Sequence, residues 1–223
     1  ADEIIVLSKG VHDYFRNQYG RETRFIPNGV NRPEIRKAEL ITDKFGLTKD
    51  SYILFLGRLV PEKGIRYLIE AFKNVKTEKK LVIAGGSSDT DSFMKELKEL
   101  AKDDKRIIFT GFVQGQMLEE LYSNAYIYTL PSDLEGMPLS LLEAMSYGNC
   151  CLVSDIQECT EVVEDKALIF KKSNVQDLQN KLQEACDRAE KVMELKQQAA
   201  DYICKKYNWD DVVEETLKLY KRK

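Results

Sequence analysis

The chain has 223 residues, of which 43% are apolar and 32% are charged, values typical of a soluble globular protein with a buried core. The formal net charge of -3 and the pI near 5.5 provide no overall attraction to nucleic acid or to an anionic membrane, so we expect no nucleic-acid partner. The cysteines form no CxxC pair and the chain has a single histidine. We therefore expect no zinc site, and a cytoplasmic protein with reduced thiols.

Short aliphatic runs alternate with stretches of helical periodicity, which predicts an α/β fold: a Rossmann-like parallel sheet with helices on both faces. The predicted strands span residues 3–8, 24–27, 52–57, 80–85, 106–111, 125–130, 150–154 and 167–170. The predicted helices span residues 64–76, 90–102, 115–124, 138–147, 174–187, 189–206 and 209–221. Ligands of such sheets bind beyond the carboxyl ends of the strands, so the loops that follow the strands are the place to look for chemistry.

The polar stretch 28–50 interrupts this alternation, because Pro33 and the Asn28-Gly29 turn break any regular pattern. We place a boundary there. Residues 1–28 are expected to form a strand-helix-strand unit outside the main sheet, 29–50 a connector, and 51–223 the main domain. The missing initiator methionine and the abrupt start in a strand predict that the chain is part of a longer protein.

A basic pair stands in the segment GRLVPEKG (57–64), directly after a buried strand. Arg58 offers a planar fork of donors and Lys63 a mobile point charge, a combination that suits a diphosphate. The alternative is a pair of ordinary solvated surface charges.

Two glutamates flank a helix start in PSDLEGMPLSLLEAM (131–145). Pro138 suits the first turn of a helix, so the free amides of that turn lie between Glu135 in the loop and Glu143 one turn into the helix. An anion at these amides, with a carboxylate for hydroxyl groups on either side, matches the layout of a nucleotide-sugar. The alternatives are a turn cap with a dipole interaction, and the acid and base of a glycoside hydrolase.

Other features have plainer interpretations. The DxD in SSDTD, Asp89 and Asp91, is expected to be a solvated loop or helix cap. His12 is expected to be an ordinary helix residue. The apolar stripe of the last helix is expected to dock on the core; it contains Trp209, Val212, Val213, Leu217 and Tyr220. No GxGxxG follows any predicted strand, which disfavours dinucleotide binding.

The segments GRLVPEKG, KLVIAGG, IIFTGFV and PSDLEGMPLSLLEAMSYG stand in the order and spacing of the donor-binding half of retaining glycosyltransferases with the GT-B fold. The chain resembles glycosyltransferase family four. IPNGV (26–30) resembles the segment that leads from the acceptor half to the donor half. The resemblance covers nearly the whole chain and implies that the Rossmann-like sheet is the C-terminal half of a GT-B fold.

The resemblance also implies a site. Arg58 and Lys63 match the basic pair that holds the donor diphosphate and stabilises the leaving phosphate, so that neither a metal nor a cofactor is needed. Glu135 matches the glutamate that faces the donor sugar, and Glu143 the one on the ribose. The implied catalytic residues are Arg58, Lys63 and Glu135. The implied donor-binding residues are Gly57, Arg58, Lys63, Val113, Glu135, Gly136, Met137, Pro138, Leu139, Ser140 and Glu143.

The implied activity is transfer of a hexose-type sugar from a nucleotide-sugar, with a UDP-sugar as the expected donor, to a glycan or glycolipid with retention of configuration. Polysaccharide, glycolipid or cell-envelope assembly is the expected pathway. The resemblance implies that residues 1–28 are a remnant of the N-terminal acceptor domain, the rest of which is missing. The acceptor would bind that domain, so this fragment is expected to bind nucleotide and transfer nothing. Further expectations are contact of the full-length protein with the inner membrane face and self-association through residues 1–28. A nucleotide-sugar-binding module without catalysis and a nucleotide-sugar epimerase remain alternatives, and the base, sugar, acceptor and linkage stay open.

Overall fold

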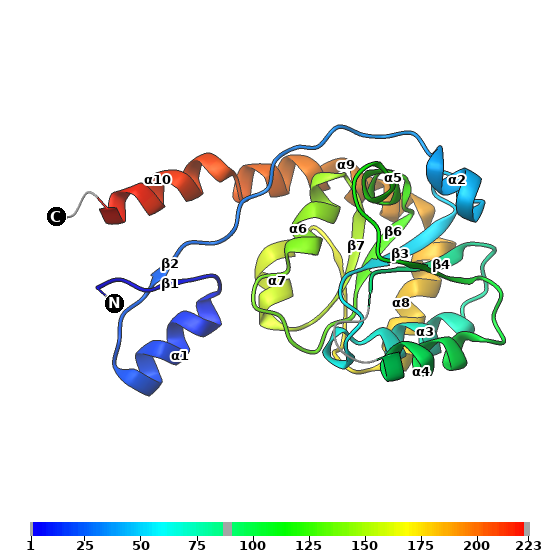
Figure 1. Ribbon diagram of the computed structural model, residues 1–223, viewed down its shortest axis with the longest axis horizontal. Coiled ribbons are helices and arrows are strands. Elements are labelled where there is room, and N and C mark those ends of the chain that lie inside the picture. The colour runs from blue at the N-terminus through cyan, green and yellow to red at the C-terminus, as the bar shows by residue number, and fades with distance from the viewer. Residues whose placement is uncertain (1, 87–90, 221–223) are drawn as a thin grey trace.

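A computed structural model describes residues 2–86 and 91–220, and in these residues six parallel strands form the main sheet in the order β5-β4-β3-β6-β7-β8 (Figure 1). The strands are β3 (Tyr52–Leu56), β4 (Lys80–Ala84), β5 (Ile107–Gly111), β6 (Ile127–Leu130), β7 (Cys150–Ser154) and β8 (Leu168–Phe170). The chain enters at β3, runs outward to β5 and returns to β6 on the other side of β3. The predicted fold class is confirmed, and the strand order reverses between β3 and β6, where such sheets bind ligands.

Helices cover both faces of the sheet, which explains why its strands are continuous apolar runs. In β3, Tyr52 and Leu54 enter one core layer, whereas Ile53 and Phe55 enter the other, and all four are fully buried. One face carries α3 (Ile65–Lys73), α4 (Asp91–Ala101) and α8 (Val175–Asp187), and the other carries α5 (Gln116–Asn124), α6 (Leu139–Ser146) and α7 (Gln157–Val163). The long helix α9 (Ala189–Lys206) contributes to both core layers. Its Val192 packs in the layer of Phe55, and its Ile203 packs in the layer of Leu54.

Helix α2 (Leu40–Phe45) was not predicted, because it lies in the stretch read as a connector. Its Ile41 is fully buried against α5. The buried carboxylate of Glu120 accepts hydrogen bonds from the amides of Glu39, at 2.9 Å, and Ile41, at 3.1 Å. Burial acts to raise the pKa of Glu120, but these amide hydrogen bonds outweigh it and hold that pKa below its usual value. The capping group thus comes from a distant helix, which local sequence signals cannot reveal.

The described part of the chain before Gly29, here called the N-terminal unit (residues 2–28), stands apart from the main sheet. Strands β1 (Ile5–Val6) and β2 (Arg24–Phe25) pair in parallel in a sheet of their own, joined by α1 (Lys9–Tyr19). His12 on α1 lies 2.8 Å from the Thr23 hydroxyl and so ties the helix to the start of β2, a structural role. Tyr19 on the same helix is 63% exposed, so this unit leaves a large aromatic side chain uncovered.

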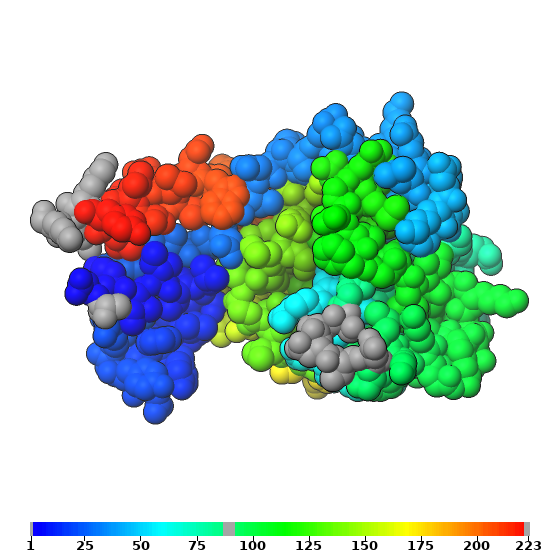
Figure 2. All heavy atoms as spheres, viewed as in Figure 1, coloured from blue at the N-terminus to red at the C-terminus, as the bar shows by residue number. Residues whose placement is uncertain are grey.

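The last helix, α10 (Trp209–Tyr220), does not dock on the core, so that prediction was wrong: none of its described residues is buried. Its preceding turn is held at the edge of the core, where the Tyr207 carbonyl accepts from the Val30 amide at 2.7 Å. Beyond that point, Trp209 lies against Gly29, and Glu215 and Lys218 border a cavity together with Thr23 and Arg24 of the N-terminal unit. Figure 2 shows α10 (red) beside the N-terminal unit (blue) at one end of the molecule, and Leu219 shares a cavity there with Phe25.

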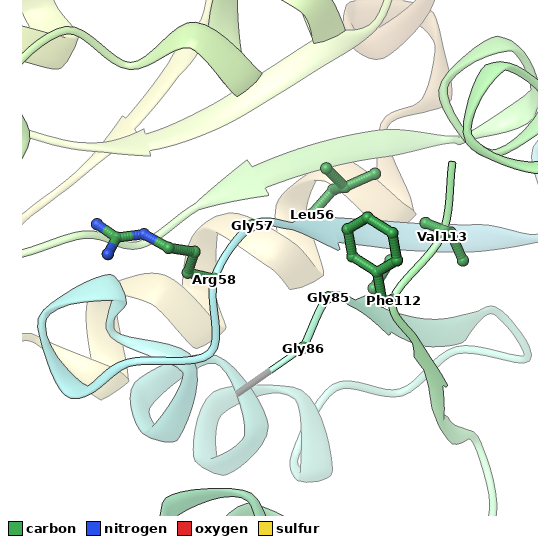
Figure 3. Close-up of a pocket in the computed structure, with 8 residues that line it drawn as sticks. Leu56, Gly57, Arg58, Gly85, Gly86, Phe112 and Val113 are labelled. Atoms are coloured by element: carbon green, nitrogen blue, oxygen red, sulfur yellow. The ribbon is translucent and has the colours of Figure 1, made fainter. Parts of the chain in front are cut away.

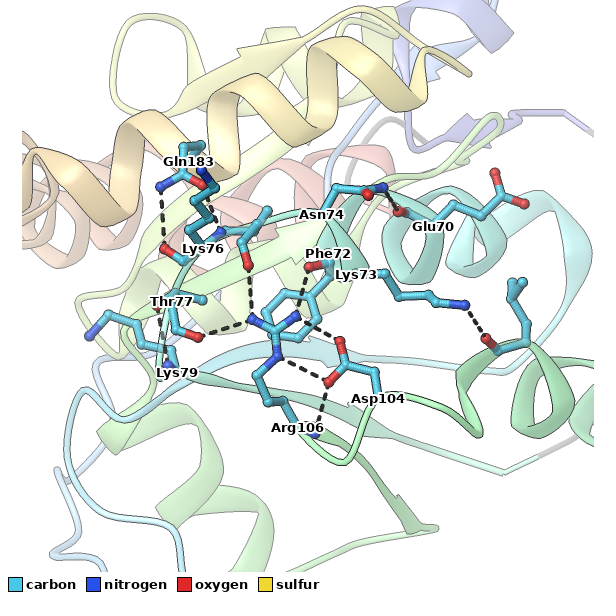
Figure 4. A network of polar contacts seen from close by, with 12 residues as sticks. Glu70, Phe72, Lys73, Asn74, Lys76, Thr77, Lys79, Asp104, Arg106 and Gln183 are labelled. Atoms are coloured by element: carbon cyan, nitrogen blue, oxygen red, sulfur yellow. Dashed lines mark hydrogen bonds and ion pairs between the residues drawn. The ribbon is translucent and has the colours of Figure 1, made fainter.

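A saturated polar network lies at the amino ends of the strands (Figure 4). The Arg106 guanidinium donates to the carbonyls of Val75, at 2.8 Å, and Thr77, at 3.0 Å, and to the Asp104 carboxylate at 2.7 Å. It also stacks 4.6 Å from the Phe72 ring. Arg106 thus fastens the turn after α3 to the start of β5.

Two further observations concern the described residues alone. Within residues 2–86 and 91–220, no helix combines the length and apolarity needed to cross a bilayer. Asp89 lies outside the described residues and the side chain of Asp91 is not described, so the expectation for the DxD pattern stays a prediction.

Candidate functional site

A cavity of about 360 Å³ opens at the carboxyl ends of β3, β4 and β5 (Figure 3). Its walls come from three strand ends and the loops that follow them, and are formed by Leu56, Gly57, Arg58, Ala84, Gly85, Gly86, Phe112 and Val113. Gly85 has φ +147°, and a Cβ there would lie 1.9 Å from the Gly57 carbonyl oxygen. Only glycine allows this close approach of the two loops, which shapes the floor of the cavity.

Three predicted donor-binding residues line this cavity: Gly57, Arg58 and Val113. The exposed Arg58 side chain points away from Val113, at the opposite side of the opening (Figure 3). Among the residues that the structure describes, no carboxylate or carbonyl accepts a hydrogen bond from its guanidinium. Arg58 is therefore a cation available to an anionic ligand.

Phe112 was not predicted as a site residue, yet its ring stands over the cavity and is 75% exposed (Figure 3). An aromatic ring so exposed at the wall of a cavity offers a large, flat apolar surface to a ligand. The sequence signal was an aromatic residue directly after Gly111, at the end of β5, where a core residue is not expected.

Lys63 and Glu135, predicted as separate ligand contacts, form an ion pair with each other. Lys63 ends the 3₁₀ turn η1 (Pro61–Lys63), and its Nζ lies 2.6 Å from Glu135 Oε1. The Lys63 and Glu135 side chains are only 16% and 5% exposed. Ser132 Oγ donates to the same carboxylate oxygen at 2.6 Å. The structure therefore brings the loop after β3 and the loop after β6 together at one charged point.

Helix α6 begins where the sequence placed it, directly after Pro138. Of the two amides predicted to meet a phosphate, that of Leu139 donates to the Met137 carbonyl at 2.9 Å, and that of Ser140 lies in the first turn, where helix amides lack helical partners. Tyr128 ties this turn to the end of β3, because its hydroxyl lies 2.8 Å from Ser140 Oγ and 3.2 Å from the Leu56 carbonyl.

Glu143 has different surroundings from Glu135. Its Oε2 accepts a hydrogen bond from the Tyr122 hydroxyl at 3.0 Å. The residue as a whole is exposed, but enough protein surrounds the carboxyl group that desolvation raises its pKa, and the Tyr122 hydrogen bond offsets this only in part. Glu143 also borders a second cavity, of about 250 Å³, between α5 and α6. The two glutamates thus lie on different sides of the α6 N-terminus, with no shared partner among the described residues.

The predicted loop residues between the glutamates face the N-terminal unit. Gly136, Met137 and Pro138 line a narrow crevice together with Leu7 and Phe25 of that unit. The Glu135 carboxylate therefore lies on a loop that also borders the crevice between the two parts of the described chain.

The described residues contain no group of three or more His, Cys, Asp or Glu side chains placed to hold a metal ion. The thiols are poor nucleophiles, because burial raises the pKa of Cys150 to about 12 and that of Cys151 well above its usual value.

Residues 37–202 match the family described as glycosyl transferases group 1. The chain belongs to this family. The predicted resemblance is thereby confirmed at the level of family and fold, because curated relatives and solved structures of glycosyltransferases agree with it.

Among curated relatives of this group 1 glycosyl transferase chain, an uncharacterised glycosyltransferase from Methanocaldococcus jannaschii is 30% identical over 98% of the chain and 60% of its own length. The N,N'-diacetylbacillosaminyl-diphospho-undecaprenol alpha-1,3-N-acetylgalactosaminyltransferase of Campylobacter jejuni is 28% identical over 100% of the chain and 61% of its own length. The chain thus spans about 60% of the length of these relatives.

Solved structures agree closely with the fold. Sucrose-phosphate synthase from Thermosynechococcus elongatus superposes with a TM-score of 0.87 at 25% identity, covering 100% of this chain and 58% of that one. The Anabaena protein HepE, solved with UDP-glucose, superposes with a TM-score of 0.88 at 18% identity, covering 99% of this chain and 64% of that one. The HepE likeness shows the fold alone.

Proposed function

We propose that this chain is the donor-binding half of an enzyme that transfers a sugar from a nucleoside diphosphate sugar to an acceptor. The observation that carries the proposal is the Lys63–Glu135 ion pair, 2.6 Å long and largely shielded from water, at the same edge of the sheet as the cavity lined by Arg58. A cation and a hydroxyl acceptor in one place suit the junction between a diphosphate and a sugar. The family supports this assignment.

The residues divide the donor between them. Arg58 and Lys63 would hold the diphosphate, and Glu135 would accept hydrogen bonds from sugar hydroxyls. The amide of Ser140, in the first turn of α6, would add a donor to the phosphate at the positive end of the helix. Glu143 would accept from the ribose hydroxyls, and the base would occupy the cavity beneath Phe112 and beside the Val113 main chain. Stacking on an exposed aromatic ring suits any base, because every base has a π-face.

The reaction would be transfer with retention, in which the acceptor attacks from the face that the nucleoside diphosphate leaves. Negative charge grows on the leaving phosphate in the transition state. Arg58 and Lys63 would stabilise it, so the proposed mechanism needs neither a metal nor a cofactor. The remaining roles of the chain are to orient the donor and to hold its sugar through Glu135.

The finer assignments are also proposals. We propose a hexose as the transferred sugar and UDP as the carrier, supported by the Anabaena structure solved with UDP-glucose. Assembly of a polysaccharide, glycolipid or cell-envelope glycan is supported by relatives such as the O-antigen chain mannosyltransferase B of Escherichia coli. The acceptor would bind the part of the protein outside this chain, so this chain alone would bind nucleotide without transferring sugar. Self-association through residues 1–28 is supported by exposed side chains such as Tyr14 and Tyr19.

Calorimetric titration of this chain with UDP, GDP and ADP tests the proposal. We expect one nucleotide to bind selectively, and Arg58→Ala and Glu143→Ala to abolish that binding. Arg66→Ala is the matched control, because the Arg66 guanidinium is already bound by Glu96 on the neighbouring helix α4. Binding that survives in both site variants would refute the assignment of these residues. Sugar transfer by the full-length protein would separate an enzyme from a binding module without catalysis.

A further inference from the structure

The loop that carries Glu135, residues 131–138 and here called the Glu135 loop, is anchored through a residue to which the proposed function gives no role. The Asp133 carboxylate accepts a hydrogen bond from the Tyr67 hydroxyl at 2.9 Å on Oδ2, and one from Ser173 Oγ at 2.7 Å on Oδ1. Tyr67 belongs to α3 and Ser173 to the loop between β8 and α8. Asp133 thus joins the Glu135 loop to two separate elements.

Backbone contacts fasten the same loop to the turn that carries Lys63. The Asp133 amide donates to the Glu62 carbonyl at 2.8 Å. Gly64 has φ +67°, and a Cβ there would lie 1.9 Å from the Pro131 carbonyl oxygen, so the two backbones touch. The hydrogen bond from Tyr67 in the first turn of α3 is a third contact between the Glu135 loop and the segment that carries Lys63. Lys63 and Glu135 therefore approach each other across two loops that are bound together beneath them.

Ser173 takes a backbone conformation that serine rarely adopts. Its φ is +56°, in the left-handed region where glycine is preferred, and the residue is exposed, so core packing does not demand a serine. Its hydroxyl bond to Asp133 is the contact that glycine could not supply.

We propose that Asp133 is a positioning residue and that the clamp of Tyr67, Asp133 and Ser173 sets the position of Glu135 relative to Lys63 for binding of the donor sugar. This inference rests on the proposed function. Within the described residues, no hydrogen bond or ion pair joins the clamp to Lys63, and none of its three residues lines the cavity near Arg58. The clamp therefore acts on the sugar end of the donor and leaves the nucleotide end in place. Without the clamp, the backbone contacts at Glu62 and Gly64 still join the two loops, but the part of the Glu135 loop after Asp133 is less restrained. Glu135 then holds its position less well, whereas Lys63 stays on its turn and remains available to the diphosphate.

The test compares the affinities of this chain for UDP and UDP-glucose, and for GDP and GDP-mannose, by calorimetry. In Asp133→Ala we expect the Kd for the nucleotide-sugar that wild type binds to rise about tenfold, the equivalent of one to two lost hydrogen bonds, while the Kd for the matching nucleotide changes by less than about threefold. Asp133→Asn should restore near wild-type affinity, because an amide can still bond both hydroxyl groups.

Asp155→Ala is the matched control. The Asp155 carboxylate accepts from the Lys172 amide at 2.7 Å, one residue from Ser173, but makes no hydrogen bond to the Glu135 loop within the described residues. We expect the ratio of the nucleotide-sugar Kd to the nucleotide Kd to be the same in Asp155→Ala as in wild type. A rise of the nucleotide-sugar Kd in Asp155→Ala as large as that in Asp133→Ala would overturn the specific role of the clamp.

Ser173→Gly separates positioning from stability. Glycine relieves the left-handed backbone at residue 173, so the variant should unfold at a higher temperature than wild type. It also removes the hydroxyl, so its Kd for the nucleotide-sugar should rise by about threefold. A variant that is more stable and binds the nucleotide-sugar as well as wild type would contradict the proposal.

Failure of the clamp and failure of the proposed function give different results. If wild type binds a nucleotide-sugar and Asp133→Ala binds it equally well, the clamp is refuted and the function stands. If wild type binds none of the four compounds, the donor site is refuted. Amide hydrogen exchange at residues 134–139 then still tests the anchoring: faster exchange in Asp133→Ala than in Asp155→Ala supports it, and equal exchange overturns it.

Discussion

Two ion pairs at opposite edges of the sheet use their cations differently. At the amino ends of the strands, Arg106 gives its donors to Asp104 and to the carbonyls of Val75 and Thr77. At the carboxyl ends, Lys63 has the Glu135 carboxylate as its acceptor, and Arg58 has none among the described residues. A cation whose donors are all used can only hold the fold together. A cation with spare donors at the ligand-binding edge is free to bind an anion, so satisfaction of donors, rather than charge, distinguishes the two edges.

The largest expected effect is on catalysis. In the full-length protein, if it transfers sugar as proposed, Arg58→Ala or Lys63→Gln should weaken transition-state stabilisation by about 2 to 4 kcal/mol, as when a preorganised donor is removed. Glutamine at position 63 keeps a hydrogen-bond donor for Glu135, so the fold should persist. The measurement is kcat/KM for sugar transfer, with Lys102→Ala, which loses a surface pair with Glu99, as the control. Unchanged rates in both site variants would show that neither cation stabilises the leaving phosphate.

The reverse is expected at the other edge. Arg106→Ala leaves the Val75 and Thr77 carbonyls without their donor and should lower the free energy of unfolding by about 2 kcal/mol, while nucleotide affinity stays unchanged. Urea denaturation and calorimetry measure the two quantities. Arg188→Ala is the control, because its surface pair with Glu184 should contribute less than about 0.5 kcal/mol. A loss of nucleotide binding in Arg106→Ala would show that the two edges are coupled.

The smallest expected effects concern pH: stability at the Asp104 edge and nucleotide affinity at the Glu143 edge should be lost at different pH values. The Arg106 hydrogen bond holds the pKa of Asp104 below its usual value, so this carboxylate contributes stability above about pH 3.9, the unfolded value, and that stability disappears as the pH falls through the lower folded pKa. Desolvation instead raises the pKa of Glu143. The proposed ribose contact needs the carboxylate, so nucleotide affinity should fall at a higher pH than the Asp104 contribution does.

The measurement is nucleotide affinity against pH for wild type and Glu143→Gln, together with unfolding of wild type and Asp104→Asn. Glu143→Gln should lack the acid-side loss of affinity that wild type shows. Identical pH profiles for wild type and Glu143→Gln would remove Glu143 from the site.

The parts of the candidate site that lie close to the ends of strands could be predicted from the sequence. Arg58 and Val113 each lie two residues after a strand of the main sheet ends, and parallel strands bring those ends to one edge. The basic pair in GRLVPEKG predicted Arg58 and the family resemblance implied Val113, and both residues line the cavity. The Lys63–Glu135 contact was not predictable, because 72 residues separate them and their approach depends on Gly64 meeting the Pro131 backbone. The position of Phe112 directly after Gly111 indicates a residue outside the core, but its place over the cavity depends on three strand ends that only the fold brings together.

Apolar periodicity by itself determined the α/β class, the strands of the main sheet and its long helices, because burial on both faces imposes continuous apolar runs and amphipathic stripes. Tertiary structure alone decided the rest. Helix α2 depends on the carboxylate of Glu120 in α5. Helix α10 does not pack on the core, because the core ends where the Val30 amide bonds the Tyr207 carbonyl. The clamp at Asp133 draws on Tyr67 and Ser173, which lie 66 and 40 residues away in the chain. Such contacts join residues that only the folded chain brings together, and no local pattern records them.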